Sequence, residues 1–329
     1  MMDAAADSAG LIVMYHYVRP DRGPVPGGIR PLFADEFERQ LDWLCQTYDV
    51  VGAEDFLPRL KTNGDIENAK PICLLTFDDG TKDHAQVVTP ILSRRGLTGV
   101  FFVLSWPAER RKMPLTHAVH WLLGQGDQNV WNSFRRYARD RLGGESALGD
   151  ATQAARIYHY ETPTRARIKY AANMALPIEA TERIVEAAAL GAGRTMEDLA
   201  AEWFVSADDI REMDAAGMTI APHGSSHRSL QTLGPAGMAA EIKHSSAYIA
   251  SLTGRRAKWF APPFGASGAS PGAVAAMRST MRQAGIAASV TTEKRLLSPT
   301  MDAYALPRLD TIDLPPRGSA PARRHRGDP

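Results

Sequence analysis

The chain has 329 residues, with 38 basic and 37 acidic side chains and a formal net charge of +1. This near balance argues against a protein that grips nucleic acid or an anionic membrane, because such proteins need an excess of positive charge. The 44% hydrophobic and 23% charged residues are ordinary values for a globular protein. The longest apolar runs, such as Gly99–Leu104 and Ile286–Val290, have strand length and fall short of the ~20 residues that span a bilayer, so we expect no membrane span.

The first ten residues, MMDAAADSAG, contain two acidic and no basic side chains. They lack the apolar stretch and cleavage site of a secretory signal, so the sequence favours a cytoplasmic location. The only two cysteines are Cys45 and Cys73. We therefore expect neither a disulfide framework nor a cysteine-based metal site.

The first hundred residues alternate between strand and helix patterns. Continuous apolar runs are typical of strands buried on both faces, as in a parallel sheet. Apolar residues spaced three to four apart indicate helices between these strands, one of them ended by Gly96. The predicted strands are Leu11–Met14, Asp49–Ala53, Ile72–Phe77 and Thr98–Leu104, and the predicted helices are Ala34–Tyr48 and Lys82–Arg95.

Strand patterns are missing from residues 105–205, which contain helix-period segments instead. We interpret this segment as a helical insertion that acts as a lid or substrate cap. The insertion begins at the carboxyl end of the strand that ends at Leu104, and parallel α/β proteins place their active sites at this end of the strands. Residues 1–104 and 206–314 would then form one barrel domain, and residues 315–329, which carry Pro, Gly and Arg without an apolar period, a disordered tail.

Strand and helix patterns alternate again after the insertion. About seven strands alternating with helices imply a parallel sheet that closes or nearly closes on itself. The predicted fold class is α/β, a distorted (β/α)7-type barrel with parallel strands and a large helical insertion. The later predicted strands are Met218–Ala221, Ala257–Phe260, Ile286–Val290 and Ala305–Asp310, with helices at 207–217, 236–252 and 271–284 between them.

Residues able to do chemistry follow the predicted strands at their carboxyl ends. Parallel α/β folds gather functional groups there, so we expect these residues to form one ring. They are His16, Asp78, Asp79, His223, His227, Pro263, Phe264 and Gly265, with Arg308 inside the last strand.

Two adjacent aspartates and two histidines in this ring predict a metal site. Asp78 and Asp79 would repel each other unless a cation lies beside them. His223 and His227 are four residues apart, near enough to share an ion. Two imidazoles and one carboxylate with open positions describe a hydrolytic centre, in which the metal lowers the pKa of water and polarises a carbonyl. Taken alone, Asp-Asp-Gly is a common turn sequence. Two histidines four residues apart also occur by chance on one face of a helix. Only the placement of both motifs after strand ends favours a metal site.

The two motifs resemble those of the polysaccharide deacetylase family, the NodB-homology group also called carbohydrate esterase family 4. Thr76-Phe77-Asp78-Asp79-Gly80 matches the first family motif, and His223-Gly-Ser-Ser-His227 matches the second. The resemblance extends from about Leu11 to Asp313 apart from the insertion. It implies that Asp79, His223 and His227 hold one divalent metal, usually zinc, with cobalt or nickel accepted by related enzymes, and that Asp78 is the general base.

The chain departs from the family at two positions. The third family motif usually begins with an arginine that orients the base, and Ala261 stands in that place. The last motif usually supplies a histidine acid, and Arg308 stands there instead. A guanidinium stays protonated and cannot act as the proton donor.

His16 offers a replacement for the missing acid. Family members that modify biofilm polysaccharides carry a Tyr-His pair on the first strand, and Tyr15-His16 looks like that pair. First and last strands are neighbours in a closed barrel, so Arg308 could supply the missing arginine charge near His16. A hydrogen-bonded strand-end role for His16, and a surface pair of Arg308 with Asp310, remain open. We expect His84, in the first turn after Asp79, to be exposed.

The sequence thus predicts a metal-dependent hydrolase that removes the N-acetyl group of an amino sugar. Asp78 would act as base and His16 would protonate the departing amine, with Arg308 as a third catalytic residue. We expect Tyr15, Pro263, Phe264 and Gly265 to contact the substrate. A nucleotide sugar, a lipid-linked saccharide or a glycosylated small molecule fits a cytoplasmic enzyme. The alternatives are a non-sugar or cyclic-amide hydrolase of the same fold and an inactive carbohydrate-binding protein, and the oligomeric state stays open.

Overall fold

The computed structural model describes residues 9–22, 29–62, 70–159, 161–265 and 270–318, which form two compact units. The first contains the N-terminal strand, Pro31–Arg110 and the chain from Trp203 onward. The second consists mainly of Arg111–Glu202. The helix α4, Ser105–Arg110, belongs to the first unit, so the helical unit is slightly shorter than the predicted segment 105–205.

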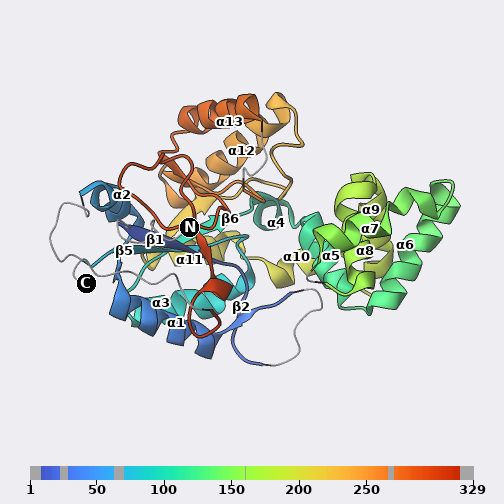
Figure 1. Ribbon diagram of the computed structural model, residues 1–329, viewed down its shortest axis with the longest axis horizontal. Helices are drawn as coiled ribbons and strands as arrows, with labels where there is room; N and C mark the ends of the chain where they lie inside the picture. Colours follow the sequence, from blue (N-terminus) through green and yellow to red (C-terminus); the bar gives the residue numbers. More distant parts are fainter. Residues whose placement is uncertain (1–8, 23–28, 63–69, 160, 266–269, 319–329) are drawn as a thin grey trace, which may run out of the picture. The chain divides into compact units, whose positions relative to one another are not determined.

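Parallel strands form the centre of the first unit, in the order β10-β1-β5-β6-β7. Figure 1 labels β1, β5 and β6 among them. Every pairing in this series is parallel, with Tyr15 opposite Phe77 and Phe101 opposite Ile220. A further short strand, β4, pairs with the first half of β5, while β6 pairs with its second half. The strands are β1 Gly10–Tyr15, β4 Asp49–Val50, β5 Ile72–Phe77, β6 Val100–Val103, β7 Thr219–Pro222 and β10 Leu309–Asp310.

A second parallel pair nearly closes this sheet into a ring. β8, Trp259–Phe260, pairs with β9, Ala288–Ser289. The Ala261 amide donates to the Pro222 carbonyl at 3.3 Å, which joins β8 to β7, and Val290 bridges in parallel to Leu306, which joins β9 to the segment before β10. The predicted distorted barrel of parallel strands is therefore confirmed, although β8, β9 and β10 are each only two residues long.

Alternation along the strands divides the apolar residues into two cores. On β5, Cys73, Leu75 and Phe77 belong to the core between the strands and the surrounding helices, whereas Ile72 and Leu74 belong to the core inside the barrel. β1 follows the same rule, because successive side chains of a strand point to opposite faces. Even-numbered residues of β1 and β5 therefore face the barrel interior. The same alternation directs His16 and Asp78, the even-numbered residues just after these strands, toward the interior.

Helices of the first unit cover the outside of the barrel. Most of their apolar faces enter the outer core, for example through Phe37 and Leu41 of α1, whereas Phe56 and Leu60 of α2 belong to the inner core. The helix predicted at Lys82–Arg95 is a π-helical turn, His84–Val88, followed by α3. The bounds are α1 Ala34–Thr47, α2 Ala53–Thr62, α3 Thr89–Arg94, α11 Ala207–Ala215, α12 Pro235–Thr253 and α13 Pro271–Gln283. A small parallel pair, β2 Val18–Arg19 with β3 Leu32–Phe33, precedes α1.

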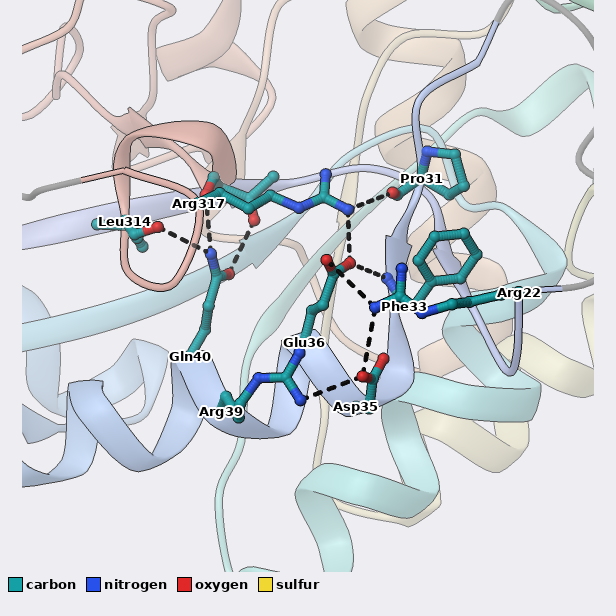
Figure 2. A network of polar contacts seen from close by, with 10 residues as sticks. Arg22, Pro31, Phe33, Asp35, Glu36, Arg39, Gln40, Leu314 and Arg317 are labelled. Carbon is teal, nitrogen blue, oxygen red and sulfur yellow. Dashed lines mark hydrogen bonds and ion pairs between the residues drawn. The ribbon is translucent and has the colours of Figure 1, made fainter.

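The segment after β10 is fastened to the start of α1 (Figure 2). Arg317 donates to the Pro31 carbonyl at 2.8 Å and to the Glu36 carboxylate at 2.5 Å, and the Glu36 carboxylate also accepts the Phe33 amide. The buried Gln40 side chain donates to the Thr311 carbonyl at 2.8 Å. The disordered tail predicted from residue 315 therefore does not include residues 315–318, and residues 319–329 lie outside the described part.

The described residues of the second unit form helices joined by turns and loops. Its helices bury one face each, for example Val130, Trp131 and Phe134 of α6. The bounds are α5 Leu115–Leu123, α6 Asp127–Arg141, α7 Ala151–Ile157, α8 Pro163–Tyr170, α9 Ile178–Gly191 and α10 Met196–Trp203, the last residue of which is counted with the first unit. The role of residues 105–205 as a lid or substrate cap stays a prediction. Among the described helices, none combines the length and apolar character needed to cross a bilayer.

Candidate active site

The turn after β5 brings Asp78 and Asp79 to the carboxyl end of the barrel. All six residues of β5 are buried, and Asp78 continues the inward-facing parity of Ile72 and Leu74. Asp79 and Gly80 both have positive φ, +79° and +68°, so the chain turns sharply after Asp78. A Cβ at Gly80 would lie 3.0 Å from a methyl group of Val103, which explains why the turn ends in glycine.

His223 and His227 come from the turn after β7. The His223 amide donates to the Val103 carbonyl at 2.9 Å, so the pairing of β7 with β6 continues up to this histidine. The chain then turns through Gly224, at φ +78°, and His227 itself has φ +59°. This turn brings the second imidazole back beside the first, with ring centroids 5.3 Å apart.

Asp79, His223 and His227 meet at one buried point. The Nε2 atoms of His223 and His227 lie 3.3 Å and 3.2 Å from the same oxygen, Oδ1 of Asp79. All three side chains are buried, and their possible ligand atoms lie within 4.8 Å of one another. This is the cluster that the two sequence motifs predict.

The protonation of His223 fits a metal ligand. Its Nδ1 lies 2.6 Å from the Ala261 carbonyl oxygen, which can only accept, so in the neutral ring Nδ1 carries the proton and Nε2 keeps its lone pair toward Asp79. Burial alone would lower the pKa of His223, but the hydrogen bond to Asp79 and the charges of Asp78 and Asp79 raise it above its ordinary value. The site thus favours a positive charge among these atoms. Two imidazole nitrogens and a carboxylate oxygen are donors that suit a divalent transition metal such as zinc.

Arg308 holds Asp78 in a buried bidentate ion pair. Its two terminal nitrogens donate to Oδ1 and Oδ2 of Asp78, each at 2.7 Å, and Nη1 also donates to the Thr76 hydroxyl at 3.1 Å. Its Nε donates to the Thr291 carbonyl at 3.0 Å. Arg308 is 2% exposed, so it lies in the barrel and not at the surface beside Asp310. Burial would raise the pKa of Asp78, but the charge and hydrogen bonds of Arg308, helped by His223 and His16, lower it.

His16 directly follows β1 and is half-buried. It has the parity of Ile12, which faces the barrel interior, and its charge is close enough to contribute to the lowered pKa of Asp78. The structure thus brings His16, Asp78 and Arg308 to the same end of the barrel. The role of His16 as acid stays a prediction.

His84 is buried under His16, whereas the sequence analysis expected it to be exposed. It is 0% exposed, and its Nε2 lies 2.8 Å from the His16 carbonyl oxygen, to which it donates. Its ring packs edge-on against Phe77 and Phe101. Burial is the main cause that lowers the pKa of His84 to about 4, so the ring is neutral. The π-helical turn at His84–Val88, which no sequence pattern signals, directs this side chain inward.

Tyr15 lies in the core and not in the site. It is 1% exposed, and its ring stacks on Phe77 and meets Phe37 edge-on. The assignment of Tyr15 to substrate binding is therefore wrong. Strand parity could have shown this, because Tyr15 shares the face of Leu11 and Val13 while His16 lies on the opposite face.

The segment after β8 places an exposed aromatic ring beside His227. Phe264 is 54% exposed, has φ +61°, and its ring centroid lies 4.8 Å from that of His227. Pro263 is buried. Gly265 has φ +69°, and a Cβ there would lie 2.6 Å from the Thr292 hydroxyl oxygen. Of the predicted substrate contacts, Phe264 is the one whose side chain is open to a ligand.

Backbone strain gathers at this site. Four non-glycine residues in the described part of the chain have positive φ, and Asp79, His227 and Phe264 are three of them. Such conformations cost of order 1–3 kcal/mol and cluster where function holds them in place.

A protein-family model matches part of this chain. Residues 180–288 match the family model of polysaccharide deacetylases, a range that contains both histidines and Phe264 but not the aspartates. None of the curated proteins matches the chain.

Several solved structures share the fold over almost the whole chain. The Streptococcus pyogenes deacetylase PplD, solved with acetate, has a TM-score of 0.55 at 16% identity, covering 92% of this chain and 91% of its own. IcaB from Ammonifex degensii has a TM-score of 0.56 at 17% identity, with coverage of 93% and 92%. A de-N-acetylase from Aggregatibacter actinomycetemcomitans has a TM-score of 0.51 at 18% identity, with coverage of 91% and 94%. The fold is thus that of the NodB-type deacetylase barrel, and a polysaccharide deacetylase domain is the class of protein that the family match supports.

Proposed function

We propose that this protein is a metal-dependent N-deacetylase that hydrolyses the acetamide of an amino sugar or of a metabolite that contains one. The observation that carries the proposal is the convergence, at one end of the barrel, of the Asp79, His223 and His227 cluster with the Asp78–Arg308 pair. The first supplies a place for a cation, and the second supplies a fixed, ionised carboxylate beside it. The match to polysaccharide deacetylases supports the same reaction.

Asp79, His223 and His227 would hold one divalent ion, zinc by donor type, with cobalt or nickel as substitutes. When bound, that ion would lower the pKa of a water molecule and polarise the amide carbonyl. Three protein donors would leave a further coordination position of such an ion for water or substrate.

Asp78 acts as the general base in this proposal. Each of its carboxylate oxygens accepts one hydrogen bond from Arg308 and keeps a further lone pair for a proton from water. Arg308 fixes the plane of the carboxylate and keeps it ionised. His16, which follows the neighbouring strand β1, protonates the departing nitrogen, since an amide anion is too basic to leave.

The substrate class follows from the acetamide and from the open ring of Phe264, because aromatic rings pack against sugar faces. A nucleotide sugar, a lipid-linked saccharide or a glycosylated small molecule suits an enzyme of the expected cytoplasmic location. We also retain the proposal that residues 105–205 limit substrate size. Shortening that segment should widen the substrate range while metal binding stays.

The deciding experiment incubates the protein, loaded with zinc, with a library of N-acetylated sugars, nucleotide sugars and glycosylated metabolites. Mass spectrometry should show one substrate class losing a single acetyl group. The Asp79→Asn variant, prepared in the same way, controls for contaminating deacetylases. Turnover of cyclic amides alone would instead support the non-sugar hydrolase, and no turnover of either class with bound metal would contradict the proposal.

A further inference from the structure

The turn that joins the two histidines is held from two sides. The Ser105 and Trp106 amides at the start of α4 donate to the Gly224 and Ser225 carbonyls at 3.2 Å and 3.1 Å, and the carboxylate of Glu241 accepts the turn's own donors. Glu241 lies on α12 between the buried Met238 and Ile242, which fix the helix to the outer core. Its Oε2 accepts the amide protons of Ser225 at 2.6 Å and Ser226 at 3.1 Å. Its Oε1 accepts the Ser226 hydroxyl at 2.6 Å.

These bonds act on the part of the turn that needs support most. Gly224 and His227 both have positive φ, and for a non-glycine residue such as His227 that conformation is strained. Successive amides that point at one anion form a concave backbone arrangement that a carboxylate stabilises. The Ser226 hydroxyl in turn accepts the Arg228 amide at 3.3 Å. Hydrogen bonds therefore hold the residues on both sides of His227 in the chain, Ser226 and Arg228.

Gly224 provides the room for this contact. A Cβ at Gly224 would lie 3.2 Å from Oε2 of Glu241 and 3.5 Å from a ring carbon of Pro263. The turn thus lies tightly between α12 and the segment that carries Phe264. Neither sequence motif includes Glu241, and only its position on the helix after the second motif brings it to the turn.

We propose that Glu241 is a positioning residue that sets the affinity of the metal centre by fixing His227 relative to His223 and Asp79. This inference rests on the proposed metal-dependent function. His223 is already fixed by β7 and by the Ala261 carbonyl, whereas His227 depends on the turn. Loss of the carboxylate lets the turn relax from its strained form, and the binding free energy then has to restore it. Partners of this kind typically change metal affinity 10–100-fold.

The test compares the zinc dissociation constants of the wild-type protein, Glu241→Gln and Glu109→Gln by competition with a chromophoric chelator. Glu109, on α4, is the matched control. Its carboxylate accepts a hydrogen bond at 2.7 Å from His244, which lies on α12 like Glu241, but it does not contact the turn. We expect Glu241→Gln to weaken zinc binding about 10–100-fold and Glu109→Gln to leave it unchanged. The visible spectrum of the cobalt-loaded protein should change in Glu241→Gln alone, which a loss of fold stability by itself would not produce.

Equal zinc affinity and equal cobalt spectra in wild type and Glu241→Gln would overturn the inference while leaving the metal centre in place. A wild-type protein that binds no divalent metal would instead overturn the proposed function itself. Should Glu241→Gln fail to fold, Ser226→Ala removes only the 2.6 Å bond to Oε1 and leaves both amide bonds. That variant should weaken zinc binding in the same direction, and unchanged affinity there would count against the inference.

Discussion

Arg308 and Asp78 meet across strand β1, which lies between β10 and β5 in the sheet order β10-β1-β5. Asp78 directly follows β5, and Arg308 directly precedes β10, whereas the sequence predicted it inside the last strand. The guanidinium gives one nitrogen to each carboxylate oxygen, at 2.7 Å in both cases, and both side chains are almost fully buried. A planar fork of this kind fixes the orientation of a carboxylate as well as its charge. The arginine that the third family motif usually supplies is thus matched here by an arginine from the other side of the site.

We expect Arg308→Ala to destabilise the barrel by about 3–5 kcal/mol, because it leaves a buried carboxylate without its counter-charge. Adding Asp78→Asn should restore part of that loss, since the neutral amide is less costly to bury. Urea unfolding of the wild type, both single variants and the double variant measures the coupling. Additive effects of the two substitutions would mean that the pair is not energetically linked.

Substitution of the metal ligands should remove the metal and leave the fold. His223→Ala and His227→Ala each delete one of three donors, so most bound zinc and nearly all activity should be lost. Elemental analysis after gel filtration gives the metal content, and circular dichroism confirms the fold. One equivalent of tightly bound zinc in the double variant would show that the cation binds elsewhere.

The two adjacent aspartates should separate in the same assay. Asp78→Asn should keep the metal, because Asp79 and not Asp78 joins the histidine cluster, and should lose about 10²- to 10⁴-fold in turnover, the usual contribution of a positioned base. Asp79→Asn should lose both metal and turnover. If metal content follows the opposite order, the two roles are exchanged.

His16→Ala tests the proton donor. The variant should keep its metal and its unfolding midpoint but lose most turnover. The basic limb of the pH profile, which reports the loss of a proton needed by the leaving group, should disappear or move. Near-normal turnover would leave the donor to be found among other residues.

His84 should make the barrel sensitive to acid. Its pKa is about 4 in the folded protein against 6.5 for an ordinary histidine, so the unfolded chain binds a proton first as the pH falls. The stability that this neutral ring contributes is complete above pH 6.5 and is lost between pH 6.5 and 4, by roughly 3 kcal/mol at most.

The difference in unfolding free energy between wild type and His84→Gln should therefore shrink across this window. Charges of Asp78, Asp79 and His16 also act on the ring and are present in both proteins. His244→Gln, which changes a partly exposed histidine on α12, is the control. A difference in unfolding free energy that stays constant with pH would contradict the lowered pKa of His84 in the folded protein.

The sequence predicted the long, strongly patterned elements well. Strand β5 matches its predicted bounds, and α1 ends one residue before its predicted end, because each has an unbroken apolar run or a regular apolar face. Strands β8, β9 and β10 are shorter than predicted, since hydrogen bonding to a neighbour, and not apolar character, decides where a strand ends. The helix α2, which begins at Ala53 where a strand was expected to end, lacks a clear starting signal and contains Pro58.

The site could be predicted only where its chemistry lies in short motifs. Asp79, His223 and His227 come from two such motifs, and the structure brings them together. The ion pair of Arg308 with Asp78 depends on how the barrel closes, and the burial of His84 depends on a π-helical turn. Neither is a property of local sequence.

The chain order of this barrel has a consequence for its synthesis. β6 and β7 are neighbours in the sheet, but Arg111–Glu202, the main part of the helical unit, lies between them in the chain. During translation β6 therefore emerges long before its partner, and a compact intervening unit shortens the loop that must close for the two edges to pair. Asp78 likewise lacks its counter-charge until Arg308, 230 residues later in the chain, has been synthesised. Docking of the last strand thus completes the barrel and neutralises its buried charge in one event, so a nascent chain that stops short of Arg308 keeps both an open seam and an uncompensated carboxylate.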